Sequence, residues 1–488
     1  MEEVKHNCGI CVGRSLHDTY NFIESLQHRG RDATGIAAIS DDRIDVLKWI
    51  GDVKSFDKGD LQHIFDKDYH TFMAHVRYAT RGEKDPDSLL REAHPIVIGG
   101  EQERRNDHLI IRDCDYACVH NGQVDEKYLQ MSNGTNLQTE TDTEKLLHFY
   151  KKNGIGGVLS SVPGAFTIAI ADKRSKDIIA ARDINGIKPG FLGFKDKKYV
   201  LASEDIAFQK NGAVVVEEMI PGTAYYLSPD GNYSSENFEN PKNKKCFFEH
   251  NYIANVNSSL DGISVRALRK RLGEKLAEEI NLPEIDFVSF LPRCPEPAAR
   301  SFAAETNSEF LPIFYKRKAQ RSFQGPNDSE RKSSIKGNLH LRPGIEKVIR
   351  GKNLVVIDDS TIRGTNSSWV RHLLYDIAGV SKAYLLNYTP QIGIVPEDGI
   401  PRGCEFGVDM PPEESENHKF IARGKSLEEI SNKIGMPVRY ISKEGMIDVF
   451  ESFGIKNEDL CTYCIGGEHP FENLENKVEL TISENENI

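Results

Sequence analysis

The pattern of apolar residues changes near residue 235, and this change constrains the fold of the 488-residue chain more than any other feature. Up to that point many short apolar runs are bounded by Gly, Pro, Asp and Asn, which is typical of strands. Clear examples are 35–40, 72–78, 117–121, 166–171, 178–182 and 199–202. Two helices are indicated, over 17–27 and 143–152. We therefore predict an α+β first domain with layered antiparallel sheets over residues 8–235.

The second part alternates between strands and helices. A segment rich in Asn, Ser and Lys over 230–245 is expected to be a linker. Beyond it we expect strands at 286–291, 353–357 and 383–387, and helices at 265–280, 297–305 and 367–378. Such alternation predicts an α/β domain with a parallel doubly wound sheet over 236–471, with ligands bound at the carboxyl ends of its strands. The acidic, Asn-rich tail over 472–488 is expected to fray.

Composition excludes several function classes. A net charge of −12 argues against a nonspecific nucleic-acid binder and suits a soluble cytoplasmic protein. Apolar runs such as 165–171 are too short to span a bilayer, so we expect no membrane partner. Residues 1–7 include two acidic residues and no apolar core, unlike a secretory signal. The nine cysteines are therefore expected to serve metal binding or catalysis, not disulfides.

Cys8 stands directly before a glycine, behind a seven-residue leader. If the leader is removed, the thiol and an α-amine share one residue, and the amine can act as the base for the thiol near neutral pH. The alternative is that Cys8 is a small apolar residue in an N-terminal strand.

A second motif begins with the apolar strand 354–357 and continues into a polar loop. Two carboxylates at the end of such a strand can hold vicinal ribose hydroxyls, while the backbone N–H groups of the loop hold a phosphate. The residues concerned are Asp358, Asp359, Ser360, Thr361, Arg363, Gly364 and Thr365. The alternative is a plain strand-to-helix turn with acidic capping.

The first half resembles the glutaminase domain of N-terminal-nucleophile (class II) glutamine amidotransferases. The resemblance rests on ordered blocks at 8–10, 26–36, 74–80, 120–122, 141–144 and 180–183. It implies that Cys8 is the nucleophile and that Asn121 and the N–H of Gly122 form an oxyanion hole. It also implies that Arg77 binds the α-carboxylate of glutamine and Asp142 its α-ammonium group. Taken singly, an Arg in a strand, an Asn-Gly turn and a helix-capping Asp would each have a structural explanation.

The second half resembles type I phosphoribosyltransferases, which use phosphoribosyl pyrophosphate (PRPP). The resemblance implies that the motif at 358–365 binds PRPP and Mg²⁺. Basic residues at 316–324, among them Arg321, resemble a mobile loop that closes over PRPP. The chain departs from the family at 291–297, where Leu-Pro-Arg-Cys-Pro-Glu-Pro replaces a turn of the type Val-Pro-Asp-Ser-Gly. Pro295 removes a backbone donor, which puts the details of pyrophosphate and metal binding in doubt.

Four cysteines occur in strings that resemble the ligand segments of an iron–sulfur branch made as a precursor. They are Cys246, Cys404, Cys461 and Cys464. The resemblance implies a structural [4Fe–4S] cluster, and zinc is the alternative for four thiolates. The cysteines at 11, 114, 118 and 294 are expected to pack in the interior.

The order of the domains resembles the glutamine PRPP amidotransferases over nearly the whole chain. The resemblance implies that PRPP, glutamine and water give 5-phosphoribosylamine, glutamate and pyrophosphate, the first step of de novo purine biosynthesis. It also implies inhibition by purine nucleotides and a homo-oligomer, a dimer or a tetramer. Two alternatives stay open: a diverged paralogue that aminates another phosphoribosyl-type acceptor, and a PRPP-sensing regulatory protein.

Overall fold

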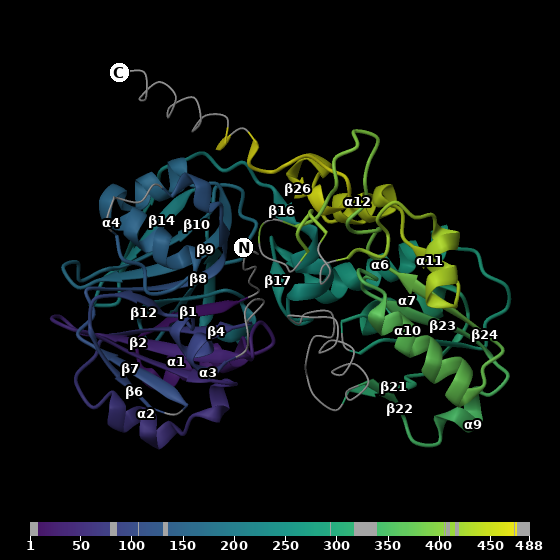
Figure 1. The fold of residues 1–488 in the computed structure, drawn as a ribbon, viewed down its shortest axis with the longest axis horizontal. Coiled ribbons are helices and arrows are strands. Elements are labelled where there is room, and N and C mark those ends of the chain that lie inside the picture. Colours follow the sequence, from purple (N-terminus) through teal and green to yellow (C-terminus); the bar gives the residue numbers. More distant parts are fainter. Residues whose placement is uncertain are drawn as a thin grey trace.

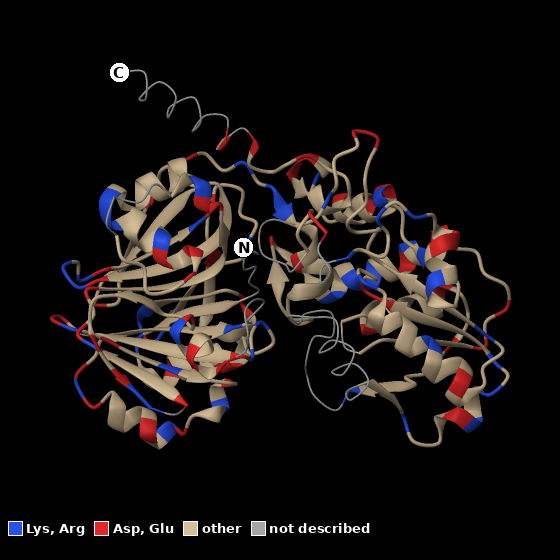
Figure 2. Ribbon diagram, viewed as in Figure 1, with Lys and Arg blue, Asp and Glu red and all other residues tan. Residues whose placement is uncertain are grey.

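The computed structural model shows two domains, with the layered sheets of the first beside the helix-covered sheet of the second (Figure 1). It describes residues 8–78, 85–105, 107–129, 135–292, 294–316, 339–404, 406, 410–414, 419–472 and 474–475. Lys and Arg are interspersed with Asp and Glu over both domains (Figure 2). Within the described ranges, no helix is long and apolar enough to cross a membrane.

Two antiparallel sheets form the centre of the first domain. The larger has the order β13-β11-β12-β1-β4-β2-β3-β7-β6 and the smaller β15-β14-β10-β9-β8-β5. The larger consists of β1 (Gly9–Gly13), β2 (Ala33–Ile39), β3 (Ile44–Ile50), β4 (Thr71–Arg77), β6 (Glu101–Arg104), β7 (His108–Arg112), β11 (Phe191–Lys195), β12 (Lys198–Ala202) and β13 (Val214–Glu218). The smaller consists of β5 (Ile96–Ile98), β8 (Tyr116–Val124), β9 (Gly164–Asp172), β10 (Ile178–Arg182), β14 (Thr223–Leu227) and β15 (Tyr233–Asn237).

The two sheets pack face to face, because alternate residues along each strand are apolar. Val12 and Met73 of the larger sheet share one core with Val119 and Ala169 of the smaller. The outer face of the larger sheet packs on α1 (Leu16–Ser25), η1 (Val53–Ser55), α2 (Lys58–Ile64) and α5 (Ile206–Gln209). The outer face of the smaller sheet packs on α4 (Asp142–Ser161). The short helices α3 (Pro86–Arg91) and η2 (Glu126–Tyr128) complete the domain. The predicted layered antiparallel fold is confirmed.

The second domain has a five-stranded parallel sheet of order β20-β19-β23-β24-β25. Its strands are β19 (Phe287–Phe290), β20 (Glu309–Phe310), β23 (Asn353–Asp358), β24 (Lys382–Asn387) and β25 (Val438–Tyr440). One face packs on α6 (Val265–Glu279), α7 (Glu296–Glu305) and α12 (Lys443–Ser452). The other packs on α9 (Ile345–Ile349), α10 (Thr365–Arg371), η4 (His372–Ala378) and α11 (Leu427–Ile434). Helices cover both faces, so the predicted doubly wound fold is confirmed.

The remaining short elements lie in the segment between the domains, at the edge of the second domain and near the C-terminal end. They are β16 (Lys245–Cys246), η3 (Glu249–Ile253), β17 (Ser259–Leu260), β18 (Ile263–Ser264), β21 (Phe314–Lys316), β22 (Leu339–Leu341), η5 (Asn457–Asp459), β26 (Leu460–Cys461) and η6 (Tyr463–Ile465). Strand β16 pairs in parallel with β26 near the C-terminus, and Figure 1 shows this pair between the two domains.

Three local expectations differ from the structure. The predicted linker over 230–245 contains edge strand β15, which pairs with β14 over Tyr233–Asn237. The helix predicted over 367–378 begins at Thr365 and becomes a π-helix at His372. The tail predicted to fray from residue 472 begins with a packed turn, in which Leu474 is only 3% exposed.

Candidate functional site

Cys8 is completely buried immediately before β1, at the edge between the two sheets of the first domain. The register of β1 and β4 pairs Gly9 with Val76 and so brings Arg77 beside Cys8. From the other sheet, the Oδ1 of Asn121 in β8 accepts a hydrogen bond of 3.3 Å from the backbone N–H of Cys8. The structure therefore brings the predicted nucleophile, carboxylate-binding residue and oxyanion residue together from both sheets.

Asn121 and Gly122, the residues predicted to form an oxyanion hole, are adjacent in β8. Because Oδ1 of Asn121 faces Cys8 N, its Nδ2 is directed elsewhere, and it is buried without a hydrogen-bond partner among the described residues. Gly122 has φ of +147°, and a Cβ there would lie 1.9 Å from the carbonyl oxygen of Ala165. The position is therefore restricted to glycine, whose N–H can approach a ligand closely.

The thiol of Cys8 is not intrinsically activated. Burial raises its pKa to about 11, although Arg77, Lys188 and Arg29 act in the opposite direction. A protonated thiol needs a base to become a nucleophile. In the chain that begins at Met1 the Cys8 nitrogen is an amide, which cannot serve as that base.

Arg77 and Asp142 supply opposite charges to the site. Arg77 ends β4, pairs with Glu92 at 2.8 Å through Nη2, and has a buried Nε without a partner among the described residues. Asp142 begins α4, and its carboxylate accepts hydrogen bonds from the N–H of Val124 and the hydroxyl of Thr143. Burial raises the pKa of Asp142 to about 7. A cation next to this carboxylate, such as an amino acid's ammonium group, would favour the ionised form.

Three buried histidines behind Asp142 were not predicted as site residues. The rings of His75 and His94 stack with centroids 4.3 Å apart. His94 and His120 both bond to the hydroxyl of Thr143, at 3.0 and 2.9 Å. Burial lowers the pKa of His120 to about 3 and that of His75 well below its usual range, so both are neutral. Through Thr143, His94 and His120 support the start of α4 at Asp142. Two of the quoted sequence blocks contain His75 and His120, whereas His94 lies outside those blocks.

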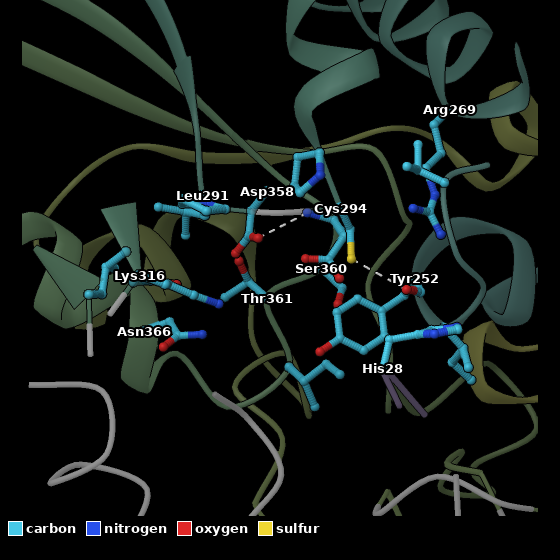
Figure 3. Close-up of a pocket in the computed structure, with 18 of the residues that line it drawn as sticks. His28, Tyr252, Arg269, Leu291, Cys294, Lys316, Asp358, Ser360, Thr361 and Asn366 are labelled. Carbon is cyan, nitrogen blue, oxygen red and sulfur yellow. Dashed lines mark hydrogen bonds between the residues drawn. The ribbon is translucent and has the colours of Figure 1, made fainter. Parts of the chain in front are cut away.

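The second domain has a cavity of about 370 Å³ where β19 and β23 end (Figure 3). The seven residues predicted for the phosphoribosyl motif all line it: Asp358, Asp359, Ser360, Thr361, Arg363, Gly364 and Thr365. Arg321, predicted to close over the same ligand, lies outside the described residues. The structure thus gathers the motif around one cavity, and the role of each residue stays a prediction.

The cavity contains polar groups that lack protein partners. Burial and the neighbouring carboxylate raise the pKa of Asp358 well above its usual range, and burial raises that of Asp359. Oδ2 of Asp359 and Oγ of Ser360 have no hydrogen-bond partner within the described part of the chain. Gly364 has φ of +77° and begins α10, which lets the loop turn sharply into the helix. Such unpaired buried groups fit a polyhydroxyl ligand or a cation.

The altered turn contributes Pro292, Cys294 and Pro295 to the same cavity, whereas Arg293 is not among the described residues. Pro295 is the N-cap of α7, and Pro297 lies in its first turn, so this helix begins with few N–H donors. Cys294 is half-buried, and its thiol donates to the carbonyl oxygen of Tyr252 at 3.4 Å. Cys294 packs against the core of the second domain but is only partly buried, so its predicted interior position is met in part, while the predicted burial of the other three non-motif cysteines (Cys11, Cys114 and Cys118) is confirmed.

Residues of the first domain also line this cavity, which the sequence did not predict. They are His28 and Arg31, from the loop between α1 and β2. Arg29, between them, donates from Nε to the carbonyl oxygen of Cys8 at 2.7 Å. Its guanidinium pairs with Glu204 of the first domain and, across the domain interface, with Glu249. One loop therefore contacts both the thiol residue and the cavity.

A glutamine amidotransferase domain model matches residues 97–210 of the chain. The curated amidophosphoribosyltransferase of Bacillus subtilis is 30% identical over 93% of this chain and 91% of its own length. The chain belongs to the amidophosphoribosyltransferase family. The amidophosphoribosyltransferase of Methanocaldococcus jannaschii is also 30% identical, over 93% of this chain and 94% of its own.

Solved structures agree with this family membership over both domains. Glutamine PRPP amidotransferase from B. subtilis, complexed with ADP and GMP, superposes with a TM-score of 0.76 at 28% identity, covering 95% of this chain and 97% of that one. A second structure, described as the allosteric regulatory enzyme of purine biosynthesis, superposes with a TM-score of 0.78 at 28% identity over 95% of this chain and 96% of its own.

The four cysteines of the predicted cluster site in this amidophosphoribosyltransferase family member come from three segments. Cys246 and Cys461 are register partners in the β16–β26 pair. Burial and the thiols of the other three cysteines together raise the pKa of Cys464 well above its usual range. Among the described residues, however, no three His, Cys, Asp or Glu side chains are arranged to hold a metal ion. The four thiols thus lie near enough to one another to interact electrostatically.

Proposed function

We propose that this chain converts PRPP, glutamine and water into 5-phosphoribosylamine, glutamate and pyrophosphate, the reaction that opens de novo purine biosynthesis. One observation carries the proposal: the loop that bonds to the carbonyl of Cys8 also lines the cavity formed by the Asp358–Thr365 motif. A nitrogen source and a phosphoribosyl site are thereby linked by two adjacent residues, His28 and Arg29.

In the glutaminase half, Cys8 attacks the carboxamide of glutamine. With the leader removed, its α-amine takes the thiol proton, which the raised pKa of the thiol makes necessary. The sulfur–carbon bond of a glutamyl thioester forms as ammonia leaves, and water then hydrolyses the thioester. Asn121 Nδ2 and Gly122 N–H bind the oxyanion, while Arg77 and Asp142 bind the two charged ends of the substrate.

Removal of residues 1–7 is part of this proposal. The Cys8 nitrogen already faces Asn121 Oδ1, so an α-amine formed there would keep an acceptor that orients it. An intact-mass measurement checks the proposal directly, since the active chain is expected to begin at Cys8. Glutaminase activity in a chain that keeps its leader would contradict it.

In the phosphoribosyl half, ammonia displaces pyrophosphate from C1 of the ribose. Asp358 and Asp359 would hold the ribose hydroxyls, and Ser360 to Thr365 would hold the 5-phosphate. Asp359, with its unpaired Oδ2, could also hold Mg²⁺, which neutralises the leaving pyrophosphate when bound. Positioning and charge stabilisation, not covalent chemistry, are the contributions of the protein here.

We also propose a structural [4Fe–4S] cluster on Cys246, Cys404, Cys461 and Cys464. All four donors are thiols, which suit iron–sulfur clusters, and a four-iron cluster is larger than one ion, so its thiolates lie farther apart. It would join the interdomain segment to the C-terminal segment along the β16–β26 pair. A brown protein with visible absorbance and bound iron is expected; a colourless protein with one bound zinc would favour the zinc alternative.

The proposal also includes the regulation and the assembly that the resemblance to the family implies. The B. subtilis neighbour is complexed with ADP and GMP, which supports purine nucleotides as inhibitors here. We also expect a homo-oligomer and a cytoplasmic location. Inhibition assays with purine nucleotides would test the expected inhibition, and the mass of the native particle in solution would test the expected homo-oligomer.

The main test is an assay of the processed protein with glutamine and PRPP, in which glutamate, pyrophosphate and phosphoribosylamine are measured. We expect all three products in equal amounts. The altered turn with Pro292 and Pro295 favours one alternative, amination of a different phosphoribosyl-type acceptor, which would give glutamate without PRPP-dependent pyrophosphate. Binding of PRPP without turnover would instead favour a sensor.

A further inference from the structure

His28 belongs to the first domain but lines the phosphoribosyl cavity of the second. A quarter of its side chain is exposed, unlike the fully buried Arg29 that follows it. In Figure 3 His28 and Tyr252 lie on one side of the cavity, and Lys316 and Asn366 lie on the other, with Asp358 and Ser360 between them. His28 therefore lies at the edge of the cavity beside Tyr252, on the side away from Lys316 and Asn366.

A buried carboxylate fixes the orientation of the His28 ring. Nε2 lies 2.8 Å from Oε1 of Glu204, which is completely buried. Glu204 also accepts hydrogen bonds from Arg29, the hydroxyl of Ser258 and the N–H of Asn255. Burial acts to raise the pKa of Glu204, but contacts with His28, Arg29 and Ser258 outweigh it and hold that pKa well below its usual range, so Glu204 is a carboxylate that accepts a hydrogen bond from Nε2. The other ring nitrogen, Nδ1, has no hydrogen-bond partner among the residues described, and it is left with a lone pair.

The loop that carries His28 also contacts both sites of the proposed function. Arg29, the next residue, donates to the carbonyl oxygen of Cys8, the residue at which the proposed function releases ammonia. The ring of His28 in turn lines the cavity in which the proposed function consumes ammonia. Two consecutive residues thus contact the Cys8 carbonyl and the cavity wall.

We propose that His28 is the base of the amination step, with Glu204 as its positioning residue. The inference rests on the proposed function. As the nitrogen lone pair forms the C1–N bond, the C1–O bond breaks and its electron pair leaves on pyrophosphate. The nitrogen now carries a positive charge, and Nδ1 of His28 accepts one of its protons to give the neutral amine product. The imidazolium, held by the Glu204 carboxylate, later returns the proton to solvent.

The other charged groups around His28 have partners or assigned roles of their own, so His28 can serve as the base. Its own loop contributes Arg29 and Arg31, and the interface segment contributes Glu249, which Arg29 and Lys188 neutralise. Arg269 of α6 also lines the cavity and donates to the carbonyl oxygens of His250 and Ala254. The remaining facing groups are the carboxyls of Asp358 and Asp359, assigned to the ribose, and Lys316 on the opposite side in Figure 3.

The test uses the full processed chain with ammonium salts in place of glutamine, so that the amination step is measured alone. PRPP-dependent pyrophosphate release is followed against pH at a constant concentration of free ammonia. In His28→Gln the amide can still bond to Glu204 but has no basic nitrogen. We expect a loss of about 10²-fold in the rate at neutral pH and the disappearance of the decline that protonated imidazole causes at acid pH. The surface variant His17→Gln is the matched control and should behave as wild type.

A second variant distinguishes a catalytic role of His28 as a base from a purely structural role. In His28→Ala, imidazole added to the buffer is expected to restore part of the lost rate, whereas a purely structural role would give no rescue. Wild-type rate and pH profile in His28→Gln would overturn the proposal, and so would a slow His28→Ala that imidazole does not rescue. Failure of the proposed function is distinguishable, because wild type itself would then release no pyrophosphate with ammonia.

Discussion

Burial acts in opposite directions on the reactive groups of the glutaminase site. It raises the pKa of the Cys8 thiol to about 11 and that of the Asp142 carboxyl to about 7. It lowers the pKa of His120 to about 3. Each shift favours the neutral form of its group, so the charges near Cys8 come from Arg77, Arg29 and Lys188 and from the carboxylates that pair with them. The zwitterionic substrate is what would bring these groups into their charged states.

The ionisation of Asp142 should control the affinity for glutamine. Only the carboxylate can pair with the ammonium group of glutamine, and in the empty site it forms as pH rises through about 7. We therefore expect the KM for glutamine to rise as pH falls below 7, by roughly tenfold per pH unit at the acid end. In Asp142→Asn the KM should be high and independent of pH over this range. A wild-type KM that stays flat between pH 5 and 8 would contradict the assignment.

The unpartnered Nδ2 of Asn121 should matter for glutamine hydrolysis alone. Removing one oxyanion donor typically costs about 10²–10³ in kcat. We expect Asn121→Ala to lose glutamine-dependent product formation by that factor and to keep the rate with ammonium salts. Asn153→Ala, on the exposed part of α4, is the matched control. An equal loss with both nitrogen sources would show that the substitution disturbs the whole molecule and not the oxyanion hole.

At the scale of elements, strand β8 serves both the core and the site. Its residues pair with β9 along their whole length, from Tyr116–Asp172 to Val124–Gly164. The alternating side chains of Cys118 and Val119 enter the cores on the two sides of the sheet. Gly122 lies within this pairing at a positive φ, which ties the shape of the oxyanion hole to the close approach of β9.

Gly122→Ala should therefore cost both stability and glutaminase activity. Its Cβ would lie 1.9 Å from a backbone oxygen, so β8 or β9 must shift. Gly351 has φ of +69° and open space around it, so Gly351→Ala carries the conformational cost without the clash. We expect the control to lose about 1 kcal/mol of unfolding free energy and Gly122→Ala to lose several. Equal losses, measured by chemical denaturation, would contradict the argument from close approach.

Local patterns account for most of the fold but not for the whole site. The helix expected over 265–280 and the strand over 353–357 appear within one residue of their predicted ends, because the spacing of their apolar residues reflects the face that each one buries in the same core. Strand β15 was missed because its residues are polar and it lies on an exposed edge. The place of His28 in the second domain's cavity was also missed, since it depends on how the domains dock. The partial exposure of Cys294 was missed as well, because the altered turn places this residue in the wall of the cavity.

At the scale of the whole molecule, the two domains meet through a buried network of charges. Arg29 and Lys188 from the first domain contact Glu249 from the second, and Glu204 accepts bonds from Ser258 across the interface. The two positive charges, on Arg29 and Lys188, balance the two negative charges, on Glu204 and Glu249. The same network holds the carbonyl of Cys8 through Arg29, so the docking of the domains and the position of the nucleophile are linked.

Glu249→Gln should break this balance. Arg29 would then keep its pair with Glu204, whereas Lys188 would lose its pair with Glu249, and an uncompensated buried charge typically costs about 3–5 kcal/mol. We expect a lower unfolding temperature and a larger loss of glutamine-dependent than of ammonia-dependent activity, because Arg29 would no longer hold the Cys8 carbonyl in place. The exposed pair of Glu24 and Lys54 offers the control Glu24→Gln, which should change neither quantity appreciably. If Glu249→Gln unfolds at the temperature of this control, or loses both activities in the same proportion, the network does not link domain docking to the nucleophile.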